Sequence, residues 1–288
     1  MQSNSPEDFG KISVAGAGTM GQGIAQLCAQ AGYRTLLYDV NPEGIVHAAS
    51  AIRRSLQSAV DKGRLRQEDR DLIYQRIEFS ADPDALIGDL LVEAIVEAPH
   101  PKQALFREAE RRNTPDMILA SNTSSIPMEV LADGLERPER VVGLHFFNPA
   151  TVMKLVEVIK GPRTLDSVVR KVSAFAARLG KTVVHAKDAP GFIVNRVARP
   201  YYAESLRLLA ENQGDVPSID AVMEARGFRM GPFRLMDLIG VDTNLSVTGS
   251  IYDGMGRPPR FAPHPVQQDK VQRGLHGRKS GAGFYSYP

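Results

Sequence analysis

A glycine-rich turn near the amino end constrains the fold of this chain more than any other feature. Residues 11–15 read as a strand, the sequence GAGTMG follows at residues 16–21, and residues 24–29 continue with helical periodicity. In such a unit the first glycine permits a tight turn, the second lets the backbone approach a pyrophosphate, and the third allows close packing of helix on strand. The alternative is a strand–turn–helix with incidental glycines. The residues expected to hold a dinucleotide here are Gly16, Gly18, Thr19, Met20 and Gly21.

A second predicted strand, at residues 35–38, ends in the carboxylate of Asp39. In dinucleotide-binding units an acid about 20 residues beyond the glycines accepts a hydrogen bond from a ribose 2′-hydroxyl and repels a 2′-phosphate. The position of Asp39 therefore favours NAD over NADP as the cofactor.

The rest of the first two thirds of the chain continues to alternate between strands and helices. Such interleaving predicts a parallel, doubly wound Rossmann-type sheet, the α/β class. Residues 41–71 interrupt it with a basic helical pair, a hairpin insertion whose charges either receive phosphates or are simply solvated. Further strands are expected at residues 90–96, 117–120, 141–145, 155–159 and 182–186, with a helix at 102–112.

The pattern changes near residue 188, where strand-like alternation stops. A smaller, all-helical domain is expected at 188–288, after a dinucleotide-binding domain at 1–187. Its helices are expected at residues 192–211, 218–226, 233–252 and 267–274, with Pro200 kinking the first of them.

A histidine and a glutamate lie in the two predicted strands that flank the Asn148-Pro149 turn. His145 ends the first strand, and Glu157 shares a face of the second with apolar neighbours that penalise its charge unless a partner is present. A histidine N–H is such a partner, and the two groups would form a proton-transfer pair. The alternative is a satisfied core histidine and a solvent-facing carboxylate on an edge strand.

Two further polar residues are candidates for ligand contact. Glu97 follows the predicted strand at 90–96, at the end where open α/β sheets bind ligands, although a solvated loop carboxylate is the alternative. Asn195 lies among apolar residues just inside the first helix of the second domain. Its amide either faces a cleft between the domains or caps a neighbouring loop.

Composition excludes several classes of protein. A formal net charge of +2 over 288 residues gives no basis for nucleic-acid or membrane partners. Residues 1–10 are polar and lack the apolar region of a secretory signal, and a single cysteine, Cys28, forbids an intrachain disulfide. A reducing, cytoplasmic setting is expected, and no metal site.

Five sequence motifs occur in one order along the chain, and two more follow in the tail. They are GAGTMG (16–21), SNTSS (121–125), HFFNP (145–149), MKLVEV (153–158) and GFIVNR (191–196), with MGPF…DLIG (230–240) and GRKSGAGFY (277–285) in the tail. Taken together, the first five resemble the L-3-hydroxyacyl-CoA dehydrogenases, and the tail motifs extend the likeness to nearly the whole chain. The compact length is similar to that of the short bacterial 3-hydroxybutyryl-CoA dehydrogenases.

The resemblance implies that an L-3-hydroxyacyl-CoA is oxidised by NAD to the 3-ketoacyl-CoA, and the reverse. By this likeness His145 takes the 3-hydroxyl proton, Glu157 orients the imidazole, and Ser124 and Asn195 hydrogen-bond the reacting oxygen. It also implies a homodimer formed through the helical domain. The remaining implied contacts are Asp39 to the adenosine ribose, Glu97 and Lys102 on the nicotinamide side, and Ser55 and Lys62 at the CoA nucleotide.

One departure from the family pattern concerns the residue after Glu97. Members usually carry an asparagine there, whereas this chain has Ala98, and Pro99 and Pro101 stiffen the following segment. Two other functions stay open: a related sugar-acid dehydrogenase of the gulonate type, and an NADH-binding protein without catalysis.

Overall fold

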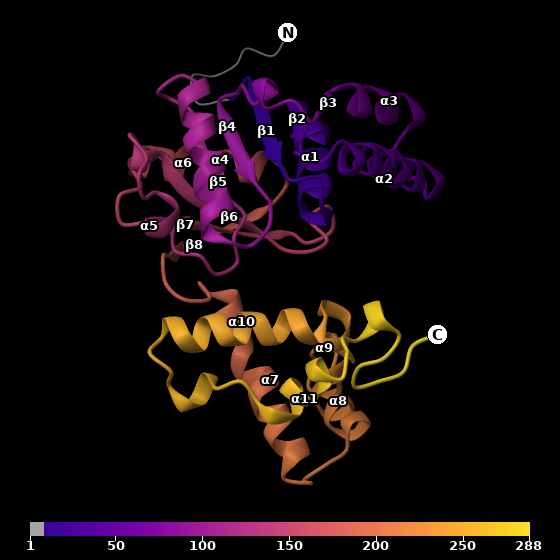
Figure 1. Cartoon of the computed structure of the whole chain (residues 1–288). Coiled ribbons are helices and arrows are strands. Elements are labelled where there is room, and N and C mark those ends of the chain that lie inside the picture. The colour runs from indigo at the N-terminus through magenta and orange to yellow at the C-terminus, as the bar shows by residue number, and fades with distance from the viewer. Residues whose placement is uncertain (1–8) are drawn as a thin grey trace. The chain divides into compact units, whose positions relative to one another are not determined.

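The computed structural model describes residues 9–288 and divides the chain into two compact units, the first ending at Ala189 and the second spanning Pro190–Pro288 (Figure 1). Most of the polar segment 1–10, expected to lack a secretory signal, lies outside the described residues. Among residues 9–288, no helix combines the length and the apolar character needed to cross a lipid bilayer.

An eight-stranded sheet forms the centre of the first unit, in the order β3-β2-β1-β4-β5-β6-β7-β8. The expected doubly wound sheet is confirmed, but it is not parallel throughout, because β7 runs antiparallel to β6. These two strands are joined by a loop without a crossover helix, and a parallel pair would need such a crossover. The strands are β1 (Lys11–Ala15), β2 (Arg34–Tyr38), β3 (Ile77–Ser80), β4 (Leu90–Glu93), β5 (Ile118–Ser121), β6 (Val141–Phe146), β7 (Leu155–Lys160) and β8 (Thr182–Lys187).

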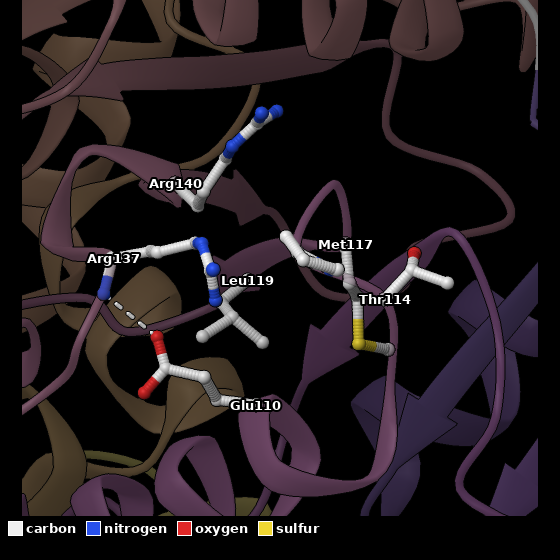
Figure 2. A pocket seen from close by; sticks show the side chains of 7 residues that line it. Glu110, Thr114, Met117, Leu119, Arg137 and Arg140 are labelled. Carbon is white, nitrogen blue, oxygen red and sulfur yellow. Dashed lines mark hydrogen bonds between the residues drawn. The ribbon is translucent and has the colours of Figure 1, made fainter.

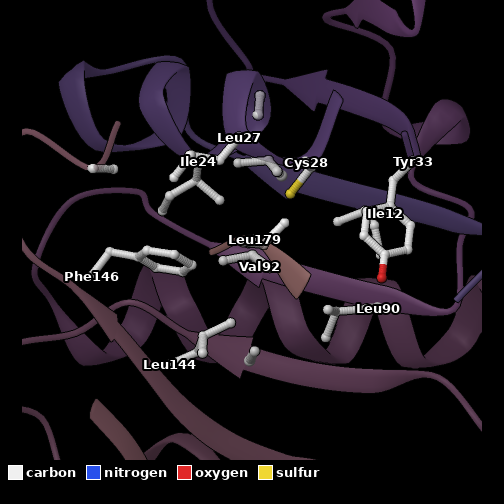
Figure 3. Packing of buried hydrophobic residues seen from close by; sticks show 14 of the residues in the cluster. Ile12, Ile24, Leu27, Cys28, Tyr33, Leu90, Val92, Leu144, Phe146 and Leu179 are labelled. Atoms are coloured by element: carbon white, nitrogen blue, oxygen red, sulfur yellow. The ribbon is translucent and has the colours of Figure 1, made fainter. Parts of the chain in front are cut away.

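Helices complete the first unit, and apolar side chains fill the space between them and the sheet. Ile24 and Cys28 of the first helix belong to the same buried cluster as Ile12, Leu90 and Val92 of the central strands (Figure 3). The helices are α1 (Thr19–Gln30), α2 (Pro42–Asp61), α3 (Gln67–Gln75), α4 (Pro99–Arg112), α5 (Met128–Leu131) and α6 (Asp166–Arg178), with short 3₁₀ turns η1 (Pro83–Ala85) and η2 (Pro138–Arg140).

Some boundaries differ from those expected. Strand β4 ends at Glu93 and not at residue 96, so Glu97 lies in the loop that follows it. Helix α4 begins at Pro99, three residues before the expected start, because proline is well suited to the first helical position. The two prolines therefore form the first turn of a helix and not a stiff loop. Neither β3 nor α6 was expected from the sequence.

The second unit is helical, as expected, around a small core that includes Tyr202, Leu206 and Phe233. The single helix expected at 233–252 is wrong: Gly240 has φ of 104° and separates two helices there. A residue with a side chain rarely adopts such a φ, so glycine permits the break. The helices are α7 (Val194–Ala210), α8 (Val216–Ala225), α9 (Pro232–Ile239), α10 (Val241–Gly254) and α11 (Pro265–Gln272), with η3 (Pro259–Phe261) and η4 (Arg278–Ser280).

Candidate active site

Each fingerprint glycine occupies a different environment in the turn between β1 and α1. Gly16 has φ of 104°, and a Cβ there would collide with the backbone carbonyl of Ala94. A Cβ at Gly21 would collide with the carbonyl of Gly16, so helix and strand need this glycine to pack closely. At Gly18 a Cβ would meet nothing within 4 Å. The turn thus leaves space at its second glycine, as the approach of a pyrophosphate requires.

The amino end of α1 is suited to an anion. Gly18 precedes the helix without a side-chain cap, and the first turn holds no acidic residue. The free N–H groups and the helix dipole favour negative charge there. Thr19 is exposed and Met20 half-buried beside them. The carboxylate of Asp39 accepts from the backbone N–H of Ala17 at 2.7 Å, which ties the end of β2 to the glycine turn. These residues fit a dinucleotide.

A buried ion pair lies just beyond the end of β4. Lys102, on the first turns of α4, is 1% exposed and places its Nζ 2.6 Å from Oε1 of the fully buried Glu93. The same ammonium lies 3.0 Å from Oε2 of Glu97. Ser121, at the end of β5, donates to the second oxygen of Glu93 at 2.6 Å. One lysine therefore joins two carboxylates from one strand end and its loop.

Glu97 extends this cluster to the loop that carries Ser124. Its Oε1 accepts from Thr123 Oγ1 at 2.6 Å, from the backbone N–H of Ser124 at 2.9 Å and from Ser124 Oγ at 3.3 Å. The Glu97 side chain is 40% exposed, and its carboxylate also bonds a neighbouring loop, so it is more than a solvated charge. Through Glu97, Lys102 is connected to the serine that was predicted to contact substrate.

The two carboxylates respond differently to this setting. Burial raises the pKa of Glu93 and outweighs the lowering effect of Lys102 and Ser121. Burial also raises the pKa of Glu97, but the charge of Lys102 and the hydrogen bonds from Thr123 and Ser124 together leave it lowered. The charge of Lys102 lowers the pKa of both carboxylates, and only in the fully buried Glu93 does burial outweigh it.

His145 and Glu157 are opposite each other in the antiparallel pair of β6 and β7. Side chains at such positions point to the same face at close range. His145 Nδ1 lies 2.8 Å from Glu157 Oε2, with the histidine side chain 8% exposed and the glutamate fully buried. The ring of Phe147 lies against the imidazole at 4.5 Å between centroids. Because an ionised carboxylate only accepts, the contact selects the tautomer with the proton on Nδ1 and the accepting lone pair on Nε2.

Asn122 links the serine loop to the histidine strand. Its Oδ1 accepts from the backbone N–H of Phe146, next to His145, at 2.8 Å. The loop after β5, which carries Ser124, is thereby fixed to the end of β6.

The remaining predicted site residues belong to other elements of the fold. Asn195 is half-buried near the start of α7, in the second unit. Ser55 is exposed on α2 and Lys62 is exposed at the end of the same helix. Seven residues separate them, so they share one helical face about two turns apart.

A small hollow elsewhere in the first unit has a different character. Glu110 accepts there from the backbone N–H of Arg137 at 2.8 Å, and Met117 and Leu119 supply apolar walls (Figure 2). Met117 precedes β5 and Leu119 lies near its start, whereas Ser121 and the serine loop lie at its carboxyl end. Among residues 9–288 no group of three or more His, Cys, Asp or Glu side chains is placed to hold a metal ion.

Sequence reasoning assigned no role to Glu93, Asn122 or Thr123. The polar run SNTSS directly after a buried strand was a visible signal for the latter two. Glu93 showed a weaker one, since a carboxylate inside an apolar strand needs a partner.

Comparisons with known proteins agree over both units. A family model for the NAD-binding domain of 3-hydroxyacyl-CoA dehydrogenase matches residues 11–189, and the model for the C-terminal domain of that enzyme matches residues 191–287. The 3-hydroxyadipyl-CoA dehydrogenase of Escherichia coli K12 is 43% identical over 96% of this chain, which spans 58% of that relative's length.

A second relative is matched over nearly its whole length. The probable 3-hydroxybutyryl-CoA dehydrogenase of Bacillus subtilis is 40% identical over 96% of this chain and 97% of its own. The crystal structure of (S)-3-hydroxybutyryl-CoA dehydrogenase from Ralstonia eutropha superposes with a TM-score of 0.94 at 34% identity, covering 98% of this chain and all of that one. The chain therefore belongs to the 3-hydroxyacyl-CoA dehydrogenase family, whose first domain binds NAD.

Proposed function

We propose that this protein oxidises L-3-hydroxyacyl-CoA esters to 3-ketoacyl-CoA with NAD, and catalyses the reverse reduction. The observation that carries the proposal is the buried 2.8 Å contact between His145 and Glu157. It supplies an oriented base beside an NAD-binding fold, and the other features below support it.

His145 is the proposed acid and base. With its Nδ1 proton directed to Glu157, Nε2 takes the proton of the 3-hydroxyl during oxidation and returns it during reduction. Glu157 stabilises the imidazolium formed in that step, because its ionised carboxylate lies at hydrogen-bond distance in a dry setting. When bound, the nicotinamide supplies the hydride acceptor. General acid–base catalysis of this kind contributes roughly 10²- to 10⁴-fold to the rate.

Ser124 and Asn195 are the proposed hydrogen-bond partners of the reacting oxygen. The hydrogen bonds from Ser124 to Glu97 support its role, since they fix the loop before any substrate arrives. Preorganised donors stabilise developing charge without reorganisation during the reaction. A polar amide near the start of a helix, among apolar neighbours, supports the role of Asn195.

The cofactor contacts follow the same reasoning. We propose that the glycine turn and the first N–H groups of α1, with Thr19 and Met20, bind the pyrophosphate, and that Asp39 binds the adenosine ribose. Glu97 and Lys102 lie on the nicotinamide side, where they also order the serine loop. The exposed face of α2 with Ser55 and Lys62 receives the CoA nucleotide, since an ammonium attracts phosphate.

A short acyl chain, such as 3-hydroxybutyryl, is the proposed substrate. The Bacillus subtilis and Ralstonia eutropha relatives are named for that substrate, and this chain covers nearly all of each. The name of the Escherichia coli relative gives an adipyl chain, so acyl length varies among relatives of similar identity.

We further propose that the chain forms a homodimer through its second unit, the helical substrate-binding domain that we expected at 188–288, and that it works in the cytoplasm. The exposed apolar side chains of Val222, Phe228 and Leu238 support an interface on that unit. The free, buried thiol of Cys28 suits a reducing compartment.

Replacing the base tests the proposal. His145→Gln should lower NADH-dependent reduction of acetoacetyl-CoA at least ~100-fold while NADH still binds, because only proton transfer is lost. His185→Gln is the matched control, since that exposed histidine of the same unit contacts only Ser173 among the hydrogen bonds described. Activity of His145→Gln close to that of His185→Gln would remove His145 from the base role.

A further inference from the structure

Arg199 is a buried cation on α7 whose hydrogen bonds end on neutral acceptors. It is 4% exposed. Its Nη1 donates to the carbonyl of Asn244 at 3.1 Å and to Thr248 Oγ1 at 2.8 Å, and its Nε donates to the carbonyl of Asn195 at 3.1 Å. Among residues 9–288 this guanidinium forms no ion pair with a carboxylate.

The missing countercharge has a cost. Burial lowers the pKa of Arg199 to about 10, and Tyr202, whose ring centroid lies 4.8 Å from Cζ, only partly opposes the effect. A charge removed from water is retained at less cost when an anion accompanies it. The surroundings of Arg199 would therefore be stabilised by an anion that the chain itself does not supply.

Asn244 adds a second donor at the same place. Its side chain is 1% exposed, and its Oδ1 accepts from Gln267 Nε2 at 2.9 Å and faces Arg199 Nη1 at 3.4 Å. These contacts fix which end of the amide is oxygen. Its Nδ2 then has no acceptor within the described residues. A guanidinium beside an amide N–H is a donor set that matches the two oxygens of a carboxylate.

The donor set lies next to a proposed substrate contact. Helical side chains tilt toward the helix amino end, and the bond from Arg199 Nε to the Asn195 carbonyl shows the guanidinium reaching back to that turn. One helical turn rises about 5.4 Å. In an extended acyl chain, three C–C bonds of ~1.5 Å separate C3 from C6, which places the two carbons about 4 Å apart. A carboxylate at C6 is thus of the right length to reach Arg199 when the oxygen on C3 is held by Asn195.

We propose that Arg199 and Asn244 bind the terminal carboxylate of a dicarboxylic 3-hydroxyacyl-CoA with an acyl chain of about six carbons. The inference rests on the proposed function and narrows its substrate class. Arg199 selects the acyl chain and takes no part in proton transfer, so a short chain ending in methyl is turned over without its help.

Two substrates of equal length test this on the unchanged protein. Reduction of 3-oxoadipyl-CoA and of 3-oxohexanoyl-CoA by NADH is compared, since these differ only in a terminal carboxylate against a methyl group. The wild-type kcat/KM should favour the diacid by about 10- to 100-fold, as expected for charged hydrogen bonds made in a dry site. Equal values, or a preference for the chain that ends in methyl, overturn the inference even if no variant folds.

Arg199→Met then tests whether the preference for the diacid depends on Arg199. Arg207→Met, on the same helix, is the matched control. The first variant should lose the preference through a higher KM for 3-oxoadipyl-CoA and keep acetoacetyl-CoA turnover, while the second keeps both. An equal loss on both substrates in Arg199→Met, with unchanged preference, assigns Arg199 a purely structural role and overturns the inference. Absence of turnover with every 3-oxoacyl-CoA in the wild type instead rejects the proposed function.

Discussion

The two units each bury a long cation, and they balance its charge differently. Lys102 in the first unit contacts two carboxylates, at 2.6 and 3.0 Å. Arg199 in the second unit is almost as buried, but within residues 9–288 its hydrogen bonds go only to carbonyl and hydroxyl oxygens. The first arrangement is internally complete and holds loops in place. The second supplies donors without an acid, which is what recognition of an anionic ligand requires.

The largest expected difference between the two cations is in how much the removal of each lowers the stability of the fold. Lys102→Met leaves Glu93 and Glu97 without their cation and should lower the free energy of unfolding by about 3–5 kcal/mol. Arg199→Met removes hydrogen bonds but also an uncompensated charge, and should cost only about 1–2 kcal/mol. Urea unfolding at pH 7, followed by circular dichroism, measures both. Equal losses would mean that Arg199 is as well compensated as Lys102.

A smaller effect is expected when one of the two carboxylates in the first unit is neutralised. Glu93→Gln keeps an acceptor for Ser121 and leaves Lys102 paired with Glu97, so the loss should be about 1–2 kcal/mol. Glu78→Gln, which affects a more exposed pair with Lys11, is the control and should change stability by less than about 0.5 kcal/mol. A loss in Glu93→Gln as large as in Lys102→Met would show that Glu97 does not balance the lysine.

The neutral acceptors around Arg199 in the second unit should each contribute modestly to the free energy of unfolding. Thr248→Val removes the hydroxyl that accepts from Arg199 Nη1 and leaves the Asn244 carbonyl in place, so unfolding free energy should fall by about 1 kcal/mol. The exposed Thr243 of the same helix provides the matched Thr→Val control. If Thr248→Val costs several times more, Arg199 depends on this hydroxyl as Lys102 depends on its carboxylates.

The smallest expected effect concerns pH. The pKa of Glu97 is lower in the folded protein than its usual 4.5, so its stabilising contribution is present above about pH 4.5 and is lost as pH falls through the folded pKa. Glu97→Gln should therefore weaken the acid-induced loss of stability, by less than about 1 kcal/mol because the side chain is partly exposed. Arg199→Met should leave the acid limb parallel to wild type, because Arg199 is protonated in both the folded and the unfolded state below about pH 10. Unfolding midpoints measured from pH 7 to pH 3 check this prediction, and a steeper acid limb in Glu97→Gln than in wild type would contradict the assigned sign.

Local sequence patterns were enough to predict the dinucleotide turn and the contact between His145 and Glu157. The turn is encoded by adjacent residues, and the pair follows from two strands joined by one loop, so the relevant contacts are close in sequence. The assignment of Ser124 and Asn195 came from the family resemblance and stays a prediction.

Other features depend on packing that no local pattern encodes. Lys102 follows two prolines and looks like a surface residue at a helix start, and its burial depends on how α4 returns over β4. Arg199, between Ala198 and Pro200, gave no sign of burial either. Apolar periodicity continued through residues 233–252, so the break at Gly240 was hidden by residues that suit either one helix or two.

The antiparallel ladder of β6 and β7 has a consequence for how the protein becomes active. Successive side chains of a strand point to opposite faces, so a slip of one residue between these strands would turn Glu157 away from His145. The main-chain hydrogen bonds of the ladder thus set the register in which His145 and Glu157 face each other. A chain that folds with this one register wrong could retain its secondary structure and its glycine turn and still lack the proposed proton-transfer pair.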